Sequence, residues 1–402
     1  MIDSRFKKNI FPSWLFIYKL TLGIFYPINY ILLVLLKNNT YSQSVLHISY
    51  MIHVPYYMVS ALRRQGIKAD YLAIGTSRYW DKSDFKVTYS KLPFLRPMQE
   101  MYWFWKVAAR YEVLHLHFML SISYSGWELS LAKKMKRKVV VHFRGCDIRD
   151  RTNNMKISPE VNICQNCDYF INYTGKYNCE SDYVKQRRNL VTNYADLFLF
   201  TTPDLKDFVP NNSVCLSFFT PEIDISSFFS SGNGKEIKDS IKIVHATNHP
   251  GIEDTKEIRN IIDSLKQDGY NIEFLFLNKI PHLEVLKEYQ NADLSIGKMK
   301  MGYYANAQVE SMFFGVPAIT YVRDEFVTDD LKDSGFILTN LDDLKTTLKY
   351  FLSNPAELKK KKMIARSSIL SLHNNDKLAR SLVGLYRSIN LSGDICAISE
   401  KN

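Results

Sequence analysis

Short apolar segments alternate with helix-like segments along most of this chain, and this alternation constrains the fold more than any other feature. SVLHISYM, EVLHLHFML, KVVVHFRG, DLFLFTT, IKIVHATN and NIEFLFLN each have the length and composition of a buried strand. Amphipathic stretches of helical length separate them, for example about 254–269. Short buried strands joined by helices are typical of parallel sheets covered by helical layers. We therefore expect an α/β fold.

The alternating units form two groups, which predicts two domains. The segment SSFFSSGNGKEIKDS, residues 226–240, lies between the groups and has the Ser, Gly and charge content of a linker. A helix over about 376–390 follows the second group and is expected to cross back to the first domain. The predicted divisions are 1–40, 41–225, 226–240, 241–375 and 376–402.

The N-terminal segment predicts contact with a membrane. Residues 20–36 contain no charge, which is the lower limit of length for a bilayer span, and Pro27 and Asn29 weaken a straight one. Basic residues flank the segment at Arg5, Lys7, Lys8 and Lys37. A span with this flanking charge would place the rest of the chain outside the cytoplasm. We therefore favour an interfacial or re-entrant anchor, with a true span or a pair of core helices as alternatives.

The charge distribution separates the two halves of the chain. The net charge is +11, and residues 1–200 carry 28 basic and 14 acidic side chains, against 24 and 27 in residues 201–402. An anionic partner is therefore expected to touch the first half. Basic and aromatic residues mix at 91–106, and a second basic patch lies at 133–138, as suits a membrane interface. No recognised nucleic-acid motif accompanies them, so we expect no nucleic-acid partner.

One segment of the second half, GYYANAQVESMFFGVPAITYV at 302–322, has the pattern of a ligand-binding loop followed by a helix. Free backbone N–H groups at a helix N-terminus suit a phosphate group. Glu310, one turn into the helix, is placed to accept hydrogen bonds from a ribose diol. The alternative interpretation is an acid that stabilises the helix through its dipole.

This segment resembles the donor site of GT-B glycosyltransferases of family 4 (group 1), in which a Gly-rich loop precedes a Glu. Supporting segments are IKIVHATNHPGIEDT, EYQNADLSIGKMKMG, HISYMIHVPYYMVSALRRQGIKADYL, EVLHLHF, VVVHFRGCDIRD and TTPDLKDFVP, in collinear order over about 45–385. The resemblance implies two Rossmann-like domains facing a cleft, with the N-terminal hydrophobic helical segment added. It also implies a retaining sugar transfer from a nucleotide sugar, with no metal and no other cofactor.

The resemblance also implies donor-binding residues in the second domain. They are Asn248, His249, Lys298, Gly302, Tyr303, Gln308, Glu310 and Ser311. Two departures from the family pattern matter. Gly302 stands where many members have the first Glu of a pair, and Glu253-Asp254 replaces the usual Lys-Gly of the phosphate loop. An acid repels a diphosphate, so either Lys298 or Lys300 substitutes, or donor binding is altered or lost.

In the first domain, HFRGCDIRD implies the residues beside the donor sugar and the acceptor. His142, Arg144 and Asp147 are the candidate catalytic residues, and His117 and Arg149 are assigned to the acceptor side. Arg144 replaces the usual His before the Gly, and His142 lies two residues earlier on the same strand face. The alternative is a strand end whose charges cap the next segment, and histidines at strand ends are often structural.

Six cysteines in 402 residues do not form a disulfide scaffold, which favours a reducing compartment. Cys164, Cys167 and Cys179 provide thiols for a zinc site, but their irregular spacing favours structural cysteines. The sequence therefore predicts a glycosyltransferase, peripheral or monotopic at the cytoplasmic face of the inner (plasma) membrane. Its expected partners are a nucleotide sugar, an anionic membrane surface and a lipid-linked or polysaccharide acceptor, as in bacterial polysaccharide biosynthesis. A non-catalytic GT-B-like partner protein and a sugar-nucleotide epimerase are the alternatives.

Overall fold

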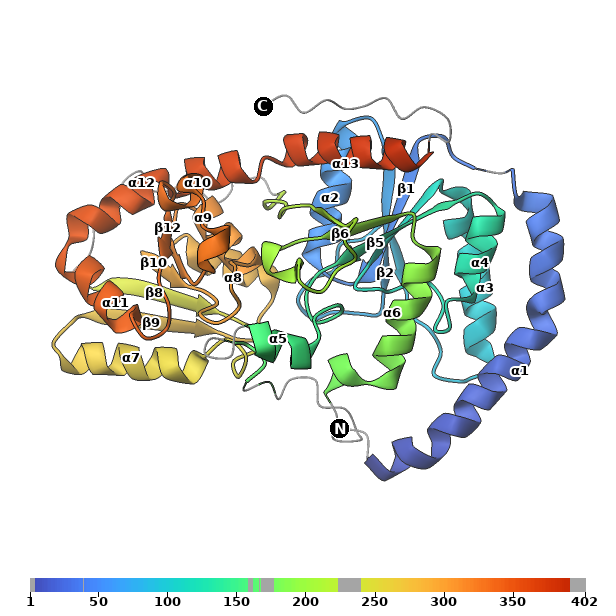
Figure 1. The fold of residues 1–402 in the computed structure, drawn as a ribbon, viewed down its shortest axis with the longest axis horizontal. Helices are drawn as coiled ribbons and strands as arrows, with labels where there is room; N and C mark the ends of the chain where they lie inside the picture. Colours follow the sequence, from blue (N-terminus) through green and yellow to red (C-terminus); the bar gives the residue numbers. More distant parts are fainter. Residues whose placement is uncertain are drawn as a thin grey trace.

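A computed structural model describes residues 4–38, 40–157, 162–165, 167, 177–222 and 240–390. The predicted α/β fold is confirmed, because the described residues form two separate sheets of parallel strands with helices on their faces (Figure 1). Residues 223–239 are outside the described ranges, so all of the expected linker at 226–240 except Ser240 lies outside them. The tail beyond Asn390 lies outside them as well.

The first domain contains a seven-stranded sheet in the order β3-β2-β1-β4-β5-β6-β7. Its strands are β1 (Ser44–Tyr50), β2 (Lys68–Ile74), β3 (Phe85–Val87), β4 (Val113–His117), β5 (Lys138–Phe143), β6 (Leu197–Phe200) and β7 (Val214–Cys215). Its helices are α2 (His53–Arg64), α3 (Leu95–Lys106), α4 (Trp127–Lys134), α5 (Arg151–Ile157) and α6 (Asp182–Tyr194). The central strands are apolar and buried on both faces, as parallel strands between helical layers must be.

The second domain contains a five-stranded sheet in the order β12-β11-β10-β8-β9. Its strands are β8 (Ile241–Ala246), β9 (Ile272–Leu277), β10 (Leu294–Ile296), β11 (Ala318–Thr320) and β12 (Phe336–Leu338). Its helices are α7 (Thr255–Gln267), α8 (His282–Tyr289), α9 (Asn306–Phe313), α10 (Asp329–Lys332), α11 (Leu344–Ser353) and α12 (Pro355–Leu372).

The last helix, α13 (Asn375–Asn390), leaves the second domain and packs on the first (Figure 1). Its apolar residues Ala379, Leu382, Val383 and Tyr386 join the core that α2 forms with the first sheet. His373 precedes the helix and contacts both the interdomain segment, through Ser217, and the second domain, through Tyr304. The two domains are therefore tied together at the C-terminal end of the described chain.

The N-terminal segment forms one long helix, α1 (Ser4–Leu36), which bends around the outside of the first domain beside α3 (Figure 1). One stripe of α1 faces the domain: the Tyr18 hydroxyl donates to Glu100 at 2.6 Å, and Asn29 accepts from the Trp105 indole at 2.7 Å. The opposite stripe is apolar and exposed, and Ile24 and Leu35 are 65% and 70% exposed. The helix is therefore docked on the domain through one face, at Tyr18 and Asn29.

Candidate active site

Two adjoining cavities lie where the carboxyl ends of the strands of the two sheets face each other. The larger cavity, of about 460 Å³, is lined mainly by the first domain, including Tyr50, Arg144 and Asp147. The smaller cavity, of about 320 Å³, lies between His53 and Trp80 of the first domain and the second domain. Both are lined by His249, Glu253, Lys298, Ala305 and Asn306. Ligands bound in the two cavities would therefore meet.

Glu310 forms the floor of the smaller cavity and contacts one imidazole from each domain. Its Oε1 lies 2.8 Å from Nε2 of His282 and 3.1 Å from Nε2 of His53. Burial alone would raise the pKa of Glu310, but the two imidazoles outweigh it and hold this pKa well below its ordinary value. The side chain is therefore an ionised carboxylate that accepts hydrogen bonds.

The chemistry of this trio does not suit a shared metal ion in the arrangement that the structure has. Two imidazoles and a carboxylate are a common ligand set. However, the His53 and His282 rings are stacked, 4.0 Å apart and 2° from parallel. A metal–imidazole bond lies in the ring plane because the nitrogen lone pair does, and lone pairs in two stacked planes do not converge on one ion. The trio is better described as a contact between the domains.

The two acids of the expected phosphate loop are each paired with a lysine. Lys298 Nζ lies 2.7 Å from Glu253, and Lys300 Nζ lies 2.7 Å from Asp254. Asp254 adopts a positive φ of 53° at the N-cap of α7, so the loop turns tightly into this helix. The pairs cancel the negative charge that would repel a diphosphate. They also use the two cations that were expected to replace the missing loop lysine.

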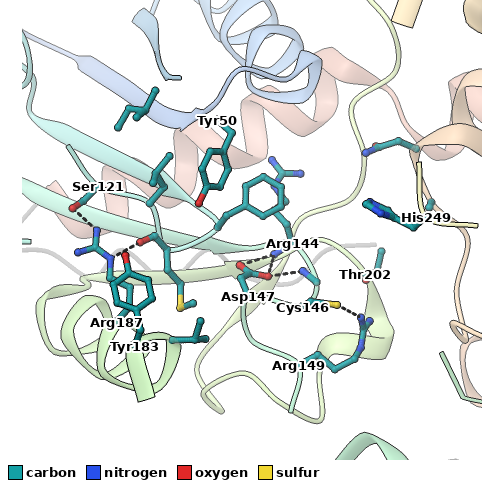
Figure 2. Close-up of a pocket in the computed structure, with 18 of the residues that line it drawn as sticks. Tyr50, Ser121, Arg144, Cys146, Asp147, Arg149, Tyr183, Arg187, Thr202 and His249 are labelled. Atoms are coloured by element: carbon teal, nitrogen blue, oxygen red, sulfur yellow. Dashed lines mark hydrogen bonds between the residues drawn. The ribbon is translucent and has the colours of Figure 1, made fainter. Parts of the chain in front are cut away.

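The turn after β5 places Arg144 and Asp147 in the larger cavity (Figure 2). The Asp147 carboxylate accepts from the backbone N–H groups of Arg144, at 3.1 Å, and Gly145, at 2.7 Å, which fixes its orientation. Burial raises the pKa of Asp147 and lowers that of Arg144 to about 9. Arg149 forms a buried ion pair with Asp204. Arg144 has no such carboxylate among the ion pairs of the described residues.

Arg144 instead contacts a buried group of histidines. His47, His115, His117 and His142 come from β1, β4 and β5 and are at most 1% exposed. In the register of the sheet His47 pairs with His115, and His117 with His142, so all four lie on one face. Burial lowers the pKa of each, to about 3 for His47. They are therefore neutral at pH 7.

The structure brings seven of the sequence-predicted site residues to the cavities: Arg144, Asp147, Arg149, Asn248, His249, Lys298 and Glu310. Among the described residues, six others line neither cavity: His117, His142, Gly302, Tyr303, Gln308 and Ser311. The Gln308 side chain caps α9 by accepting from the Ala305 N–H at 2.8 Å, and Ser311 bonds Ser295 within the core. Tyr303 stacks on Tyr304. The side chains of Gln308, Ser311 and Tyr303 therefore contact other protein groups rather than either cavity.

The cysteines of the possible zinc site are free thiols within the described part of the chain. Cys164 is buried, and its Sγ accepts from Asn154 at 3.2 Å. Burial raises the pKa of Cys179 to about 11, so this thiol is protonated at pH 7. No group of three cysteine ligand atoms within 4.8 Å of one another occurs among the described residues. A zinc site there stays a prediction.

Comparison with known proteins identifies the fold. No family model and no curated protein sequence matches the chain. Among solved structures, the chain is similar to a sucrose-phosphate synthase from Thermosynechococcus elongatus, with 13% identity, a TM-score of 0.54, and coverage of 86% of this chain and 99% of that one. It is also similar to Anabaena HepE in complex with UDP-glucose, with 9% identity, a TM-score of 0.53, and coverage of 86% and 99%.

A third similar structure is the catalytic domain of starch synthase IV from Arabidopsis thaliana, bound to ADP and acarbose. The identity is 11%, the TM-score 0.53, and the coverage 87% of this chain and 99% of that one. The chain therefore has the GT-B fold of nucleotide-sugar glycosyltransferases. Its likeness to these structures lies in the fold, at identities of 13% or less.

Sequence reasoning did not select several residues of the cavities. His53, Trp80 and His282 form the contact between the domains, and the His282 N–H donates to the Tyr79 carbonyl across the interface at 3.0 Å. Nothing in the local sequence relates His53 to His282. The buried histidines carried a readable signal, because His115 and His117 are two residues apart at the end of one strand.

Proposed function

We propose that the protein is a retaining glycosyltransferase that moves a sugar from a nucleotide sugar to a lipid-linked or polysaccharide acceptor at the cytoplasmic face of a membrane. The observation that carries this proposal is the pair of adjoining cavities, one for each substrate. The smaller cavity contains an ionised carboxylate, and the larger has Arg144 and Asp147 on its wall. Among the similar structures, HepE is in complex with UDP-glucose, and the catalytic domain of starch synthase IV is bound to ADP and acarbose.

The nucleotide would lie in the smaller cavity, with its ribose hydroxyls donating to Glu310. His53 and His282 both contact Oε1, so a ribose hydroxyl that bonds this oxygen displaces His53, whereas one that bonds Oε2 does not. The sugar and the diphosphate would extend toward the residues that the cavities share. The bond from the anomeric carbon to the phosphate oxygen breaks there, and negative charge develops on the leaving diphosphate. The guanidinium of Arg144 supplies positive charge from the facing domain.

The acceptor would enter the larger cavity, which has an aromatic wall. Tyr50, Phe118, Tyr124 and Tyr183 line it (Figure 2 labels Tyr50 and Tyr183), and the Tyr124 and Tyr183 rings are stacked 5.5 Å apart. Flat rings of this kind suit the apolar face of a sugar. The acceptor hydroxyl forms the new bond to the anomeric carbon, and its proton passes to the leaving phosphate or to Asp147.

The paired acids of the phosphate loop bear on the main alternative, a non-catalytic partner protein. Glu253 and Asp254 made that alternative serious because unpaired acids would repel the donor. Their ion pairs with Lys298 and Lys300 remove this objection to donor binding. An epimerase remains the other alternative, and it would convert a nucleotide sugar without any acceptor.

The two faces of α1 support a membrane location for the acceptor. Residues Ser13–Leu36 are long and apolar enough to cross a membrane by length and composition. However, Tyr18 and Asn29 bind the helix to the first domain at two points separated by three turns. The neighbouring helix α3 also exposes apolar side chains, at Met98 and Tyr102 and at Phe94 just before its first turn. A helix docked in this way is suited to lying in the membrane interface with its outer stripe among the lipids.

A nucleotide screen tests the transfer proposal. We expect UDP, GDP or ADP to raise the melting temperature, because a ligand at 100 times its Kd stabilises by about 2.7 kcal/mol. Glu310→Gln should remove this effect, whereas Glu357→Gln, on the outer face of α12, should keep it. Incubation of the matching nucleotide sugar with membrane lipids should then release the free nucleotide. Binding without release would favour the partner protein, and conversion of the sugar without lipid would favour the epimerase.

Flotation with vesicles containing phosphatidylglycerol tests the membrane location. Wild-type protein should float, and a double variant, Ile24→Asp with Leu35→Asp, should not, because it places charges in the outer stripe of α1. Met363→Asp is the matched control, since Met363 is 74% exposed on α12, in the other domain. Equal flotation of the double variant and the control would overturn the role of α1.

A further inference from the structure

Seven buried or half-buried side chains beside the larger cavity are linked into a closed ring of hydrogen bonds. They come from β1, β4, β5 or the residues just after β5 and β6, and from α13: Arg144, His117, His47, Tyr386, His115, His142 and Thr201. Successive contacts are 3.1 Å from Arg144 Nη2 to His117 Nδ1, 3.0 Å from His117 Nε2 to His47 Nδ1, and 3.4 Å from His47 Nε2 to Tyr386. The Tyr386 hydroxyl then lies 2.6 Å from His115 Nδ1.

The ring closes through two further contacts and returns to its start. His115 Nε2 lies 3.1 Å from His142 Nδ1, and His142 Nε2 lies 3.1 Å from the Thr201 hydroxyl. Arg144 Nη1 donates to that same hydroxyl at 3.1 Å. Each of the four imidazoles therefore uses both of its ring nitrogens.

Arg144 determines the direction of the bonds as far as Tyr386. A guanidinium only donates, so His117 Nδ1 must accept, and a neutral imidazole must then carry its proton on Nε2. That proton is donated to His47 Nδ1, which places the His47 proton on Nε2 and directs it to the Tyr386 oxygen. The Tyr386–His115 contact of 2.6 Å has the length of a bond with an O–H donor rather than an N–H donor, so Tyr386 donates to His115 and the same order passes through His142 to Thr201. In this order all four histidines are the Nε2–H tautomer.

A complete reversal is excluded at His117, which would then have to accept on both nitrogens, and a neutral imidazole cannot do this. A reversal of the second half alone would let Thr201 donate to His142 and would make His142 and His115 both Nδ1–H, with Tyr386 accepting from His47 and from His115. His115 and His142 therefore share one tautomer in either order, and the short Tyr386–His115 contact favours Nε2–H for both.

We propose that this ring is a positioning device that fixes the Arg144 guanidinium at the wall of the larger cavity, and that Tyr386 makes it depend on α13. Within the described part of the chain the Arg144 guanidinium forms no ion pair with a carboxylate, and it contacts His117, Thr201 and the Met58 sulfur. His47 and His115 lie on the neighbouring strands β1 and β4, and the Tyr386 hydroxyl of α13 joins them by contacting both. The inference rests on the proposed function, because it assumes that Arg144 acts in the cavity.

Nitrogen-15 spectroscopy of histidine side chains in the full chain tests the ring directly. At pH 7 the wild-type protein should show all four residues as the neutral Nε2–H tautomer. Tyr386→Phe cuts the ring at one point. His117 and His47 should stay ordered because Arg144 still donates to His117, whereas His115 and His142 should become tautomer mixtures, since Thr201 can then donate in the opposite direction.

Tyr111→Phe is the matched control, because it also removes one buried hydroxyl, here bonded to Asp70 at 2.6 Å, and lies outside the ring. It should leave all four tautomers unchanged. Tyr386→Phe should also lower kcat for sugar transfer about tenfold while the donor KM stays the same, as misplacement of a catalytic group does.

Two outcomes would overturn the ring: an Nδ1–H or protonated state at any of the four histidines in the wild type, or ordered His115 and His142 in Tyr386→Phe. Unchanged kcat in Tyr386→Phe would overturn its positioning role. These results are distinct from failure of the proposed function. A wild-type protein that transfers no sugar but shows four ordered tautomers would disprove the transferase and leave the ring in place.

Discussion

The molecule contains two groups of histidines with opposite surroundings. The buried group, His47, His115, His117 and His142, lies beneath α13 and ends on the cation of Arg144. The interface pair, His53 and His282, contacts the carboxylate of Glu310 beside a cavity. Both groups consist of stacked imidazoles at strand or helix ends. The two groups differ in the charge that they contact, which is a cation for the buried group and a carboxylate for the interface pair.

A cation and an anion impose different constraints on an imidazole. Burial keeps the four buried histidines neutral, and Arg144 fixes the tautomer of His117 and His47, so this group is unsuited to proton transfer. Glu310 is hydrogen-bonded to His282 of the second domain and lies 3.1 Å from His53 of the first, and a carboxylate has further acceptor sites for a hydroxyl. A ligand hydroxyl could therefore replace an imidazole at Glu310, whereas no ligand could replace a histidine of the buried ring.

The largest expected effect is the response of the buried group to acid. In the unfolded chain histidine has a pKa near 6.5, whereas burial lowers the pKa of all four ring histidines. Below about pH 6.5 the unfolded state therefore binds more protons, and stability falls as the pH falls, by up to about 1.4 kcal/mol per pH unit for each histidine.

The midpoint of urea unfolding at pH 7.5, 6.5 and 5.5 measures this loss. We expect a decrease of several kcal/mol across the lower step. His282→Leu should show the same decrease, since it leaves the ring intact. A midpoint that is the same at all three pH values would show that the ring histidines are not held neutral.

Replacing one histidine of each group by leucine should give a smaller but clear contrast in stability. His47→Leu leaves the His117 N–H without its acceptor and removes one of the two contacts of the Tyr386 hydroxyl in a fully buried site, and should cost about 2–4 kcal/mol. His282→Leu lies at the edge of a cavity, where His53 still contacts Glu310, and should cost less than about 1 kcal/mol. Urea unfolding at pH 7.5 compares them, and equal costs would contradict the distinction between the groups.

Much of the fold could be predicted from the sequence because it depends on local patterns. Apolar runs of strand length predicted the parallel strands, and the expected helix at about 254–269 is found at Thr255–Gln267. Glu310, Arg144 and Asp147 were selected from their motifs and do line the cavities. These features are encoded within a few consecutive residues.

The contacts between distant segments could not be predicted in the same way. His53 and Glu310 are 257 positions apart, and their contact depends on how the two domains face each other. Tyr386 lies on a helix whose apolar face was readable, but its hydroxyl partner His115 is set by the packing angle of α13. The sequence indicated that His115 and His117 share one face of a strand, but it did not indicate that Tyr386 closes the ring.

The smallest expected effect sharpens the comparison at the interface pair. His53→Ala frees one contact on Glu310 Oε1, so a nucleotide no longer competes with His53 for that oxygen. We expect its Kd to fall about three- to tenfold, or about 1 kcal/mol, since a ligand binds more tightly when the competent state is already populated. Isothermal titration calorimetry with the nucleotide identified by thermal shift measures the change. Ser60→Ala, on the same helix and outside both cavities, should bind as the wild type does. A weaker nucleotide complex in His53→Ala would show instead that His53 is itself a ligand contact, and the interface pair would then be part of the donor site rather than a closure over it.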